Sequence, residues 1–167
     1  MATFMKIAFL ILGMAAMLRA QGECSDSALP PGARKYINGS LPHRKESAVV
    51  FVIRFSDFGC QPCLINFLDF CDSLRAGKVR TGRGRVEIFF TRDDTPESYQ
   101  ETTMRQWLRG NGVEFPFHII PEKYLDAGRF NHSLVYLLSK GERTDCCGLI
   151  PLPWRLQETI LARLFSG

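Results

Sequence analysis

The sequence predicts a single α/β domain in which a central mixed β-sheet is flanked by helices. Two runs of strand length, AVVFVIRF (48–55) and VEIFFT (86–91), are rich in β-branched and aromatic residues and apolar enough to be buried on both faces. Each run precedes a segment with helical features, and strands that alternate with helices indicate βαβ units. The segment SLVYLLSKGERTDCCGLI (133–150) has the pattern of a β-hairpin, which would add an antiparallel pair at one edge of the sheet.

Helical spacing of apolar residues predicts where the helices lie. The first helix should begin at Pro62 and end before the glycine-rich basic segment 75–85, which we expect to form a loop. Its apolar positions are Leu64, Phe67, Leu68, Cys71 and Leu74. A second helix should run over about 95–109 and a third over 153–165, with a short extended piece at 113–120.

Composition places the chain among ordinary globular proteins. Its 167 residues suffice for one domain with a hydrophobic core, and 46% of them are hydrophobic and 23% charged. The formal net charge of +4 is too mild for a nucleic-acid binder. We therefore expect no nucleic-acid partner.

The first twenty residues, MATFMKIAFLILGMAAMLRA, predict a secretory signal peptide. A lysine precedes an apolar run that is too short to span a bilayer as a helix and that suits the central region of such a signal. We expect cleavage after Ala20; cleavage after Ala15, an uncleaved membrane anchor and a lipoprotein cut before Cys24 are the alternatives. The expected protein is extracytoplasmic, either periplasmic or secreted, with membrane association only if the segment stays attached.

The remaining chain divides at about residue 47. Residues 21–47 are rich in proline, glycine, serine and charge, which predicts an extended N-terminal segment. The α/β domain is expected over 48–167.

Six cysteines follow the expected signal, and two of them form the motif Cys60-Gln61-Pro62-Cys63. Disulfides persist outside the cytosol, so the motif admits a zinc site, a structural disulfide or a redox-active dithiol. Zinc would need a second ligand pair, for which the adjacent Cys146 and Cys147 are poorly suited. A bridge over so short a loop adds little stability. Redox exchange is therefore the favoured interpretation.

The position of the motif between a buried strand and a helix gives its cysteines different roles. Cys60 should lie at the first helical turn, where unpaired N–H groups and the helix dipole lower the pKa of a thiol. Cys63 should lie one turn deeper, where it can resolve a mixed disulfide. Pro62 suits a first turn, which has no hydrogen bond for it to remove. We expect Cys60 to attack and Cys63 to resolve, with Gln61 and Pro62 tuning the redox properties.

The segment VVFVIRFSDFGCQPCLINFLDF resembles the active-site segment of thioredoxin-like proteins. VEIFFTRDDTPESYQETTMRQWLRGNGVEFPFHII is similar to the next segment of their extracytoplasmic thiol-disulfide oxidoreductase and peroxiredoxin-like branch. The resemblance covers about residues 48–165 and implies a thioredoxin-like fold with Cys60 and Cys63 as the catalytic dithiol. It also implies no cofactor beyond the redox-active disulfide. The implied partners are a protein thiol or disulfide substrate and an upstream reductant or oxidant.

Three positions depart from the pattern of this family. The family usually has tryptophan before the first cysteine, where this chain has Gly59, which could widen access to the sulfur. Peroxiredoxins have threonine where this chain has Asp57, so peroxidase activity is not expected. Thioredoxin-like enzymes place a cis-proline before the strand that follows, facing the dithiol, whereas this chain has RFNHS. We expect His132 and Ser133 of that segment to line a substrate loop or pocket.

A second resemblance supports an alternative. NHSLVYLLSKGE resembles the Asp-His-Ser/Thr strand of Sco-type copper chaperones, and His132 matches the histidine that joins two cysteines there. The alternative is therefore copper binding by Cys60, Cys63 and His132, although Sco-type sites space their cysteines three apart. A third hypothesis is a thioredoxin-fold module that lacks catalysis.

The other cysteines and histidines are expected outside the site. Cys71 follows Cys63 on one helical face and is predicted to be a small core residue. Of Cys146 and Cys147, one should be buried and the other exposed, because neighbours in a strand point to opposite faces. A resolving or relay role for the exposed one is the alternative. His43 and His118 should be structural or solvent-facing.

Overall fold

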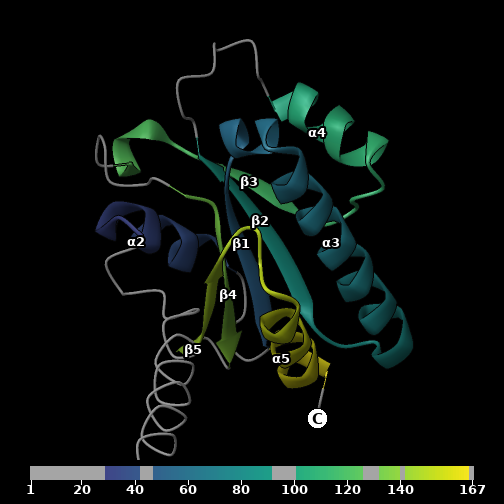
Figure 1. Cartoon of the computed structure of the whole chain (residues 1–167). Coiled ribbons are helices and arrows are strands. Elements are labelled where there is room, and N and C mark those ends of the chain that lie inside the picture. The colour runs from purple at the N-terminus through teal and green to yellow at the C-terminus, as the bar shows by residue number, and fades with distance from the viewer. Residues whose placement is uncertain (1–28, 42–46, 92–100, 126–131, 140–141, 166–167) are drawn as a thin grey trace, which may run out of the picture.

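The structure, a computed structural model, describes residues 29–41, 47–91, 101–125, 132–139 and 142–165 (Figure 1). For residues 80, 139 and 142–149 it describes the main chain alone. The expected signal peptide, Cys24 and His43 lie outside the described residues. Within these ranges, none of the helices combines the length and the apolar character that a membrane crossing requires.

The described residues form one five-stranded mixed sheet with the strand order β3-β2-β1-β4-β5. The strands are β1 (Ala48–Arg54), β2 (Arg85–Thr91), β3 (Phe117–Ile120), β4 (Leu134–Ser139) and β5 (Glu142–Leu149). β1 is parallel to β2, and β2 is parallel to β3. β4 is antiparallel to β1, and β5 is antiparallel to β4. The predicted βαβ unit and edge hairpin are both confirmed.

Helices cover both faces of the sheet, as the sequence predicts for an α/β domain (Figure 1). The helices are α2 (Pro31–Ser40), α3 (Gln61–Thr81), α4 (Glu101–Gly110) and α5 (Trp154–Phe165), and the short 3₁₀ turns are η2 (Phe55–Gly59) and η3 (Glu122–Tyr124). α3, α4 and α5 pack on one face, and α2 packs on the other. The predicted start of the second helix, at 95–100, lies outside the described residues.

The central strand β1 joins the two hydrophobic cores. Phe51 and Ile53 face the core beneath α3, whereas Val50 and Val52 face the core beneath α2, and all four side chains are buried. β1 is also hydrogen-bonded along both edges, to β2 and β4. The strand that leads to Cys60 is therefore fixed on every side.

α3 is longer than the sequence pattern predicts. The prediction that residues 75–85 form a loop is wrong for their first part, because the helix continues to Thr81. Gly82 then ends it in the left-handed region with φ of 64°, a conformation that glycine adopts without strain. Gly77 lies within the helix, and the ring of Phe165 from α5 packs so close to it that a β-carbon would overlap the ring.

α2 lies within the segment that the sequence predicts to be extended. That expectation does not hold for residues 31–40, which are helical. Pro31 occupies the first turn, where no backbone N–H is needed, and Ala33 and Ile37 are buried against the sheet. The segment thus supplies part of the second hydrophobic core.

Candidate active site

Cys60 and Cys63 form a disulfide at the start of α3, directly after the short turn η2. Their Cα atoms are 5.3 Å apart. Cys60 is the N-cap residue of α3 and is exposed, whereas Cys63 is half-buried one turn further on. The backbone oxygen of Cys60 accepts a hydrogen bond of 3.1 Å from the N–H of Leu64. Cys60 therefore lies at the N-terminal end of α3, where the helix dipole gives a positive potential.

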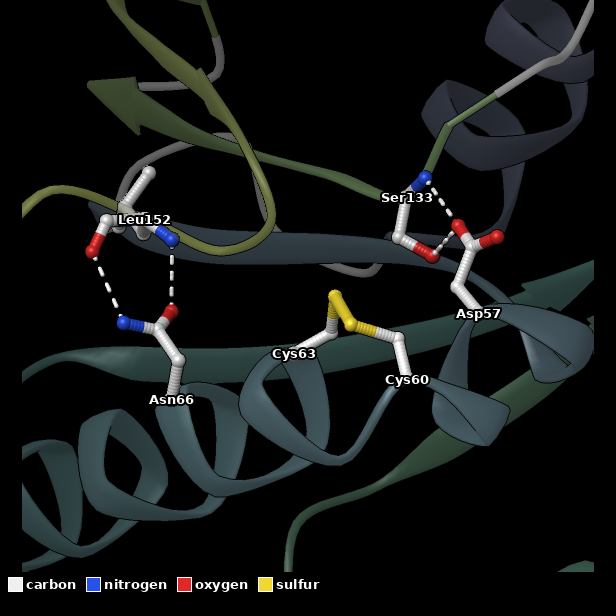
Figure 2. Close-up of a disulfide and its surroundings, with 6 residues drawn as sticks. All are labelled: Asp57, Cys60, Cys63, Asn66, Ser133 and Leu152. Atoms are coloured by element: carbon white, nitrogen blue, oxygen red, sulfur yellow. Dashed lines mark hydrogen bonds between the residues drawn. A yellow bond between two sulfur atoms is a disulfide. The ribbon is translucent and has the colours of Figure 1, made fainter.

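A carboxylate contact borders the disulfide on one side. Oδ2 of Asp57, in η2, accepts hydrogen bonds from both the backbone N–H and the hydroxyl of Ser133, at 2.8 and 2.7 Å (Figure 2). The Ser133 hydroxyl in turn accepts a bond of 2.9 Å from the backbone N–H of Arg54. These bonds fix the residue before β4 to the turn that precedes Cys60.

An amide contact borders the disulfide on the other side. Asn66, one turn after Cys63, donates to the backbone oxygen of Leu152 at 3.0 Å and accepts from its N–H at 2.6 Å (Figure 2). Gln157 of α5 donates a further bond of 2.9 Å to the same oxygen. The chain at Leu152, just beyond β5, is thereby fixed to α3.

The two bonded segments also contact one another. The N–H of Ile150 donates to the backbone oxygen of Ser133 at 3.0 Å. Figure 2 shows the disulfide lying between the Asp57–Ser133 pair and the Asn66–Leu152 pair. The start of β4 and the segment after β5 therefore lie next to each other, opposite the first turns of α3.

Comparison with solved structures identifies the fold, although the sequence matches no protein-family model and no curated protein. A thiol-disulfide isomerase from Corynebacterium glutamicum is similar over 74% of this chain and 83% of its own, with a TM-score of 0.55 and 15% identity. A secreted thiol-disulfide isomerase from the same organism is similar over 74% and 72%, with a TM-score of 0.52 and 14% identity. A thioredoxin-like superfamily protein is similar over 78% and 90%, with a TM-score of 0.51 and 13% identity. The chain has a thioredoxin-like fold.

In this thioredoxin-like fold, Ser133 occupies the position before β4 where the resemblance leads one to look for a cis-proline. The cis peptide bond within the described residues is instead Ile150–Pro151, in the segment after β5. Ser133 is buried, with 1% of its surface exposed, although the sequence expectation placed it in a substrate loop or pocket. His132 beside it is exposed.

Aromatic contacts fix the turn η2 to the helices α3 and α4. Phe58 stacks on Trp107 of α4, with ring centroids 4.8 Å apart, and its ring also lies 5.2 Å from that of Phe67. Gly59, the next residue, is exposed, and a β-carbon there would meet no atom within 4 Å. The space beside Cys60 that a larger residue would occupy is therefore open in this thioredoxin-like domain.

Cys71 belongs to the core, as the sequence predicts. It is buried beneath α3 with 2% of its surface exposed and forms no disulfide. Burial raises the pKa of the Cys71 thiol far above its ordinary value, the negative charge of Asp72 raises it further, and Arg75 opposes the shift. Cys71 is therefore not a nucleophile at neutral pH.

The metal hypotheses gain no preformed ligand cluster from this geometry. Among the residues that the structure describes, no group of three or more His, Cys, Asp or Glu side chains lies in position to hold a metal ion. Copper binding by Cys60, Cys63 and His132 stays a prediction, as do the redox roles of Gln61 and Pro62, both exposed. The side chains of Cys146 and Cys147 lie outside the described part of the chain.

His118 has a structural position, as expected. Its Nε2 atom lies 2.8 Å from Oε2 of Glu87, a buried carboxylate that also pairs with Arg85, and its ring stacks on Phe89. Glu87 and Arg85 also line a cleft of about 660 Å³ at the end of the sheet opposite the disulfide. That cleft contains none of the predicted site residues.

Asp57 and Asn66 are the residues whose role the sequence does not reveal. The closeness of Asp57 to Cys60 is visible in the sequence, but its partner Ser133 is 76 residues away. Asn66 is a polar residue one helical turn after Cys63, which is a weak signal for a residue beside the site.

Proposed function

We propose that this protein is an exported thiol-disulfide oxidoreductase that uses the Cys60–Cys63 pair to exchange electrons with protein substrates. The observation that carries the proposal is the disulfide between an exposed N-cap cysteine and a half-buried cysteine one turn deeper. This difference in exposure is what an attacking and a resolving thiol require. The oxidised pair is one end state of such a reaction.

The proposed reduction of a substrate proceeds in two displacements. The Cys60 thiolate attacks one sulfur of the substrate disulfide, forms a mixed disulfide and expels the other sulfur as a thiolate, which takes up a proton. Cys63 then loses its proton and attacks the Cys60 sulfur, which releases the second substrate thiol. Two electrons pass from the dithiol to the substrate, and the Cys60–Cys63 disulfide is regenerated. Oxidation of a substrate dithiol is the same sequence in reverse.

The start of α3 supports the first displacement electrostatically. The helix is 21 residues long and has no acidic residue in its first turn. Its unpaired N–H groups and its dipole therefore favour negative charge at Cys60. Helix N-termini lower the pKa of a cysteine below its ordinary value of roughly 8.5 and so raise the fraction of reactive thiolate.

The expected partners follow from this chemistry. A protein disulfide or dithiol is the substrate, and a second thiol or disulfide protein restores the starting redox state. The apolar run within residues 1–20 supports export, where such exchange finds disulfide substrates.

The experiment is a turnover assay on the chain from residue 21. Dithiothreitol-driven reduction of insulin is measured for the wild type and for Cys60→Ser, with Cys71→Ala as the matched control for loss of a thiol. We expect turnover in the wild type and in the control, and none in Cys60→Ser. Turnover that survives in Cys60→Ser would refute the proposed role of Cys60.

A Cu(I) titration of the reduced protein tests the alternative from the sequence. Absence of turnover together with stoichiometric copper binding that His132→Ala weakens would replace the proposal by copper binding. If the protein shows neither turnover nor copper binding, the third hypothesis is supported, which is a thioredoxin-fold module without catalysis.

A further inference from the structure

One residue links the local turn at Cys60 to a segment far along the chain. The backbone oxygen of Asp57 accepts a hydrogen bond of 3.1 Å from the N–H of Cys60. Its side-chain carboxylate accepts two bonds from Ser133, 76 residues away, at 2.7 and 2.8 Å. Figure 2 shows the Asp57 side chain pointing toward Ser133, beside the disulfide.

The buried hydrogen-bond donors of Ser133 depend on the Asp57 carboxylate as their acceptor. Its surface is 1% exposed, so water does not replace a lost partner readily. Its N–H and hydroxyl donate to Asp57, its hydroxyl accepts from Arg54, and its backbone oxygen accepts from Ile150. Asp57 is thus the acceptor for both buried donors of Ser133, and leaving such donors unpaired is costly.

The same contact decides which main-chain groups the site offers. The N–H of Ser133 is already bound to Asp57, and the backbone oxygen is already bound to Ile150. The N–H of Ser133 is therefore not available to a substrate chain while the Asp57 carboxylate holds it. The start of β4 and the segment after β5 therefore present a fixed surface to a substrate.

We propose that Asp57 is a positioning residue that holds the start of β4 beside the Cys60–Cys63 disulfide and thereby sets how tightly a protein substrate docks. The proposal rests on the proposed function, since it concerns docking for that exchange. Asp57 does not take part in the bond changes. Its loss should therefore weaken docking of a large substrate and spare the reaction of the disulfide with a small dithiol.

Three variants and a control separate this role from loss of charge or of fold. Asp57→Ala removes the acceptor, whereas Asp57→Asn removes the charge and keeps an amide oxygen that can accept from Ser133. Ser133→Ala removes the hydroxyl bond to Asp57, keeps the bond from the Ser133 N–H, and also removes the acceptor of the Arg54 N–H. Asp69→Ala is the matched control, because Asp69 is an exposed aspartate of α3.

Two rates are measured for each variant: steady-state reduction of insulin, and reduction of the Cys60–Cys63 disulfide by dithiothreitol alone. For Asp57→Ala we expect a KM for insulin that is roughly tenfold higher, with kcat and the dithiothreitol rate within about twofold of the wild type. Asp57→Asn should recover most of the KM, and Asp69→Ala should match the wild type. An unchanged KM in Asp57→Ala, or equal losses in Asp57→Ala and Asp57→Asn, would overturn the proposal.

Hydrogen exchange of the Ser133 amide separates this proposal from the proposed function. If the wild type does not reduce insulin, the proposed function fails, and the exchange rate still reports on Asp57. Asp57→Ala should speed exchange at Ser133 by at least tenfold, while exchange at Leu152, which is bonded to Asn66, stays unchanged. Unchanged exchange at Ser133 would show that Asp57 does not hold this segment.

Discussion

Gly77 of α3 lies directly against the phenyl ring of Phe165 at the end of α5, and a β-carbon on Gly77 would overlap that ring. The two helices approach one another over this glycine. α5 is thereby held on the same face of the sheet as α3.

Replacement of Gly77 by alanine should therefore destabilise the protein. Overlap with a packed ring costs about 1–3 kcal/mol, and the better helix propensity of alanine returns at most about 1 kcal/mol. We expect a net loss of up to about 2 kcal/mol in the free energy of unfolding, measured by urea denaturation.

Gly39 provides the matched control, because it is also helical and a β-carbon there would meet no atom within 4 Å. Gly39→Ala should leave stability unchanged or raise it. In a Phe165→Ala background, Gly77→Ala should cease to destabilise, since the ring has been removed. Equal losses from Gly77→Ala with and without the ring would contradict the packing explanation.

Asn66→Ala should weaken the attachment of the segment after β5. The change leaves the N–H of the buried Leu152 without its acceptor, and its oxygen keeps the bond from Gln157. We expect a loss of about 1–3 kcal/mol in the free energy of unfolding. Asn38→Ala, at an exposed position in α2, should change stability by less than about 0.5 kcal/mol. Indistinguishable values for the two variants would rule out a stabilising role for the Asn66 contact.

In the reduced protein, Cys60 should react with iodoacetamide before Cys63. Cys60 is exposed at the helix N-terminus, and Cys63 is half-buried one turn on. We expect at least about a tenfold difference in rate at pH 7, read by mass spectrometry of the labelled peptides, because the thiolate is the reactive form. Preferential labelling of Cys63 would reverse the assignment of the attacking thiol.

Cys71 should make stability fall at alkaline pH. Burial raises the pKa of its thiol in the folded protein, so above roughly pH 8.5 the unfolded state alone releases this proton. The stability that the neutral thiol contributes is complete below that pH and is lost as the pH rises toward the folded pKa. Relative to Cys71→Ala, the wild type should lose about 2 kcal/mol between pH 7 and pH 10, measured by urea unfolding. Parallel pH curves for the two proteins would show that Cys71 is not buried as a neutral thiol.

The strands could be predicted because consecutive residues in the sequence show that they are buried. β1 and β2 are mostly apolar, with Glu87 of β2 as a buried exception, and the structure buries both strands on both faces. The end of α3 could not be predicted in this way. Glycine usually weakens a helix, so Gly77 suggests that α3 ends early. Only its contact with Phe165, from the far end of the chain, explains why glycine is present.

The disulfide motif could likewise be located from the sequence, whereas its surroundings could not. The position of Cys60 after a strand and before a helix depends on neighbouring residues. Asp57 and Asn66 bind segments 76 and 86 residues away, and no local pattern reveals such partners. The sequence does not predict α2, because proline and glycine near its ends outweigh the two buried residues that fix it to the sheet.

The way β1 is held has a consequence for the proposed thiol-disulfide exchange. The strand is paired along both edges and buried on both faces, and it ends at the turn that carries Cys60. The chain therefore enters the start of α3 from a strand that its neighbours and both hydrophobic cores hold in place. For the exchange proposed above, this means that the strand leading to Cys60 offers the same framework to the oxidised and to the reduced pair.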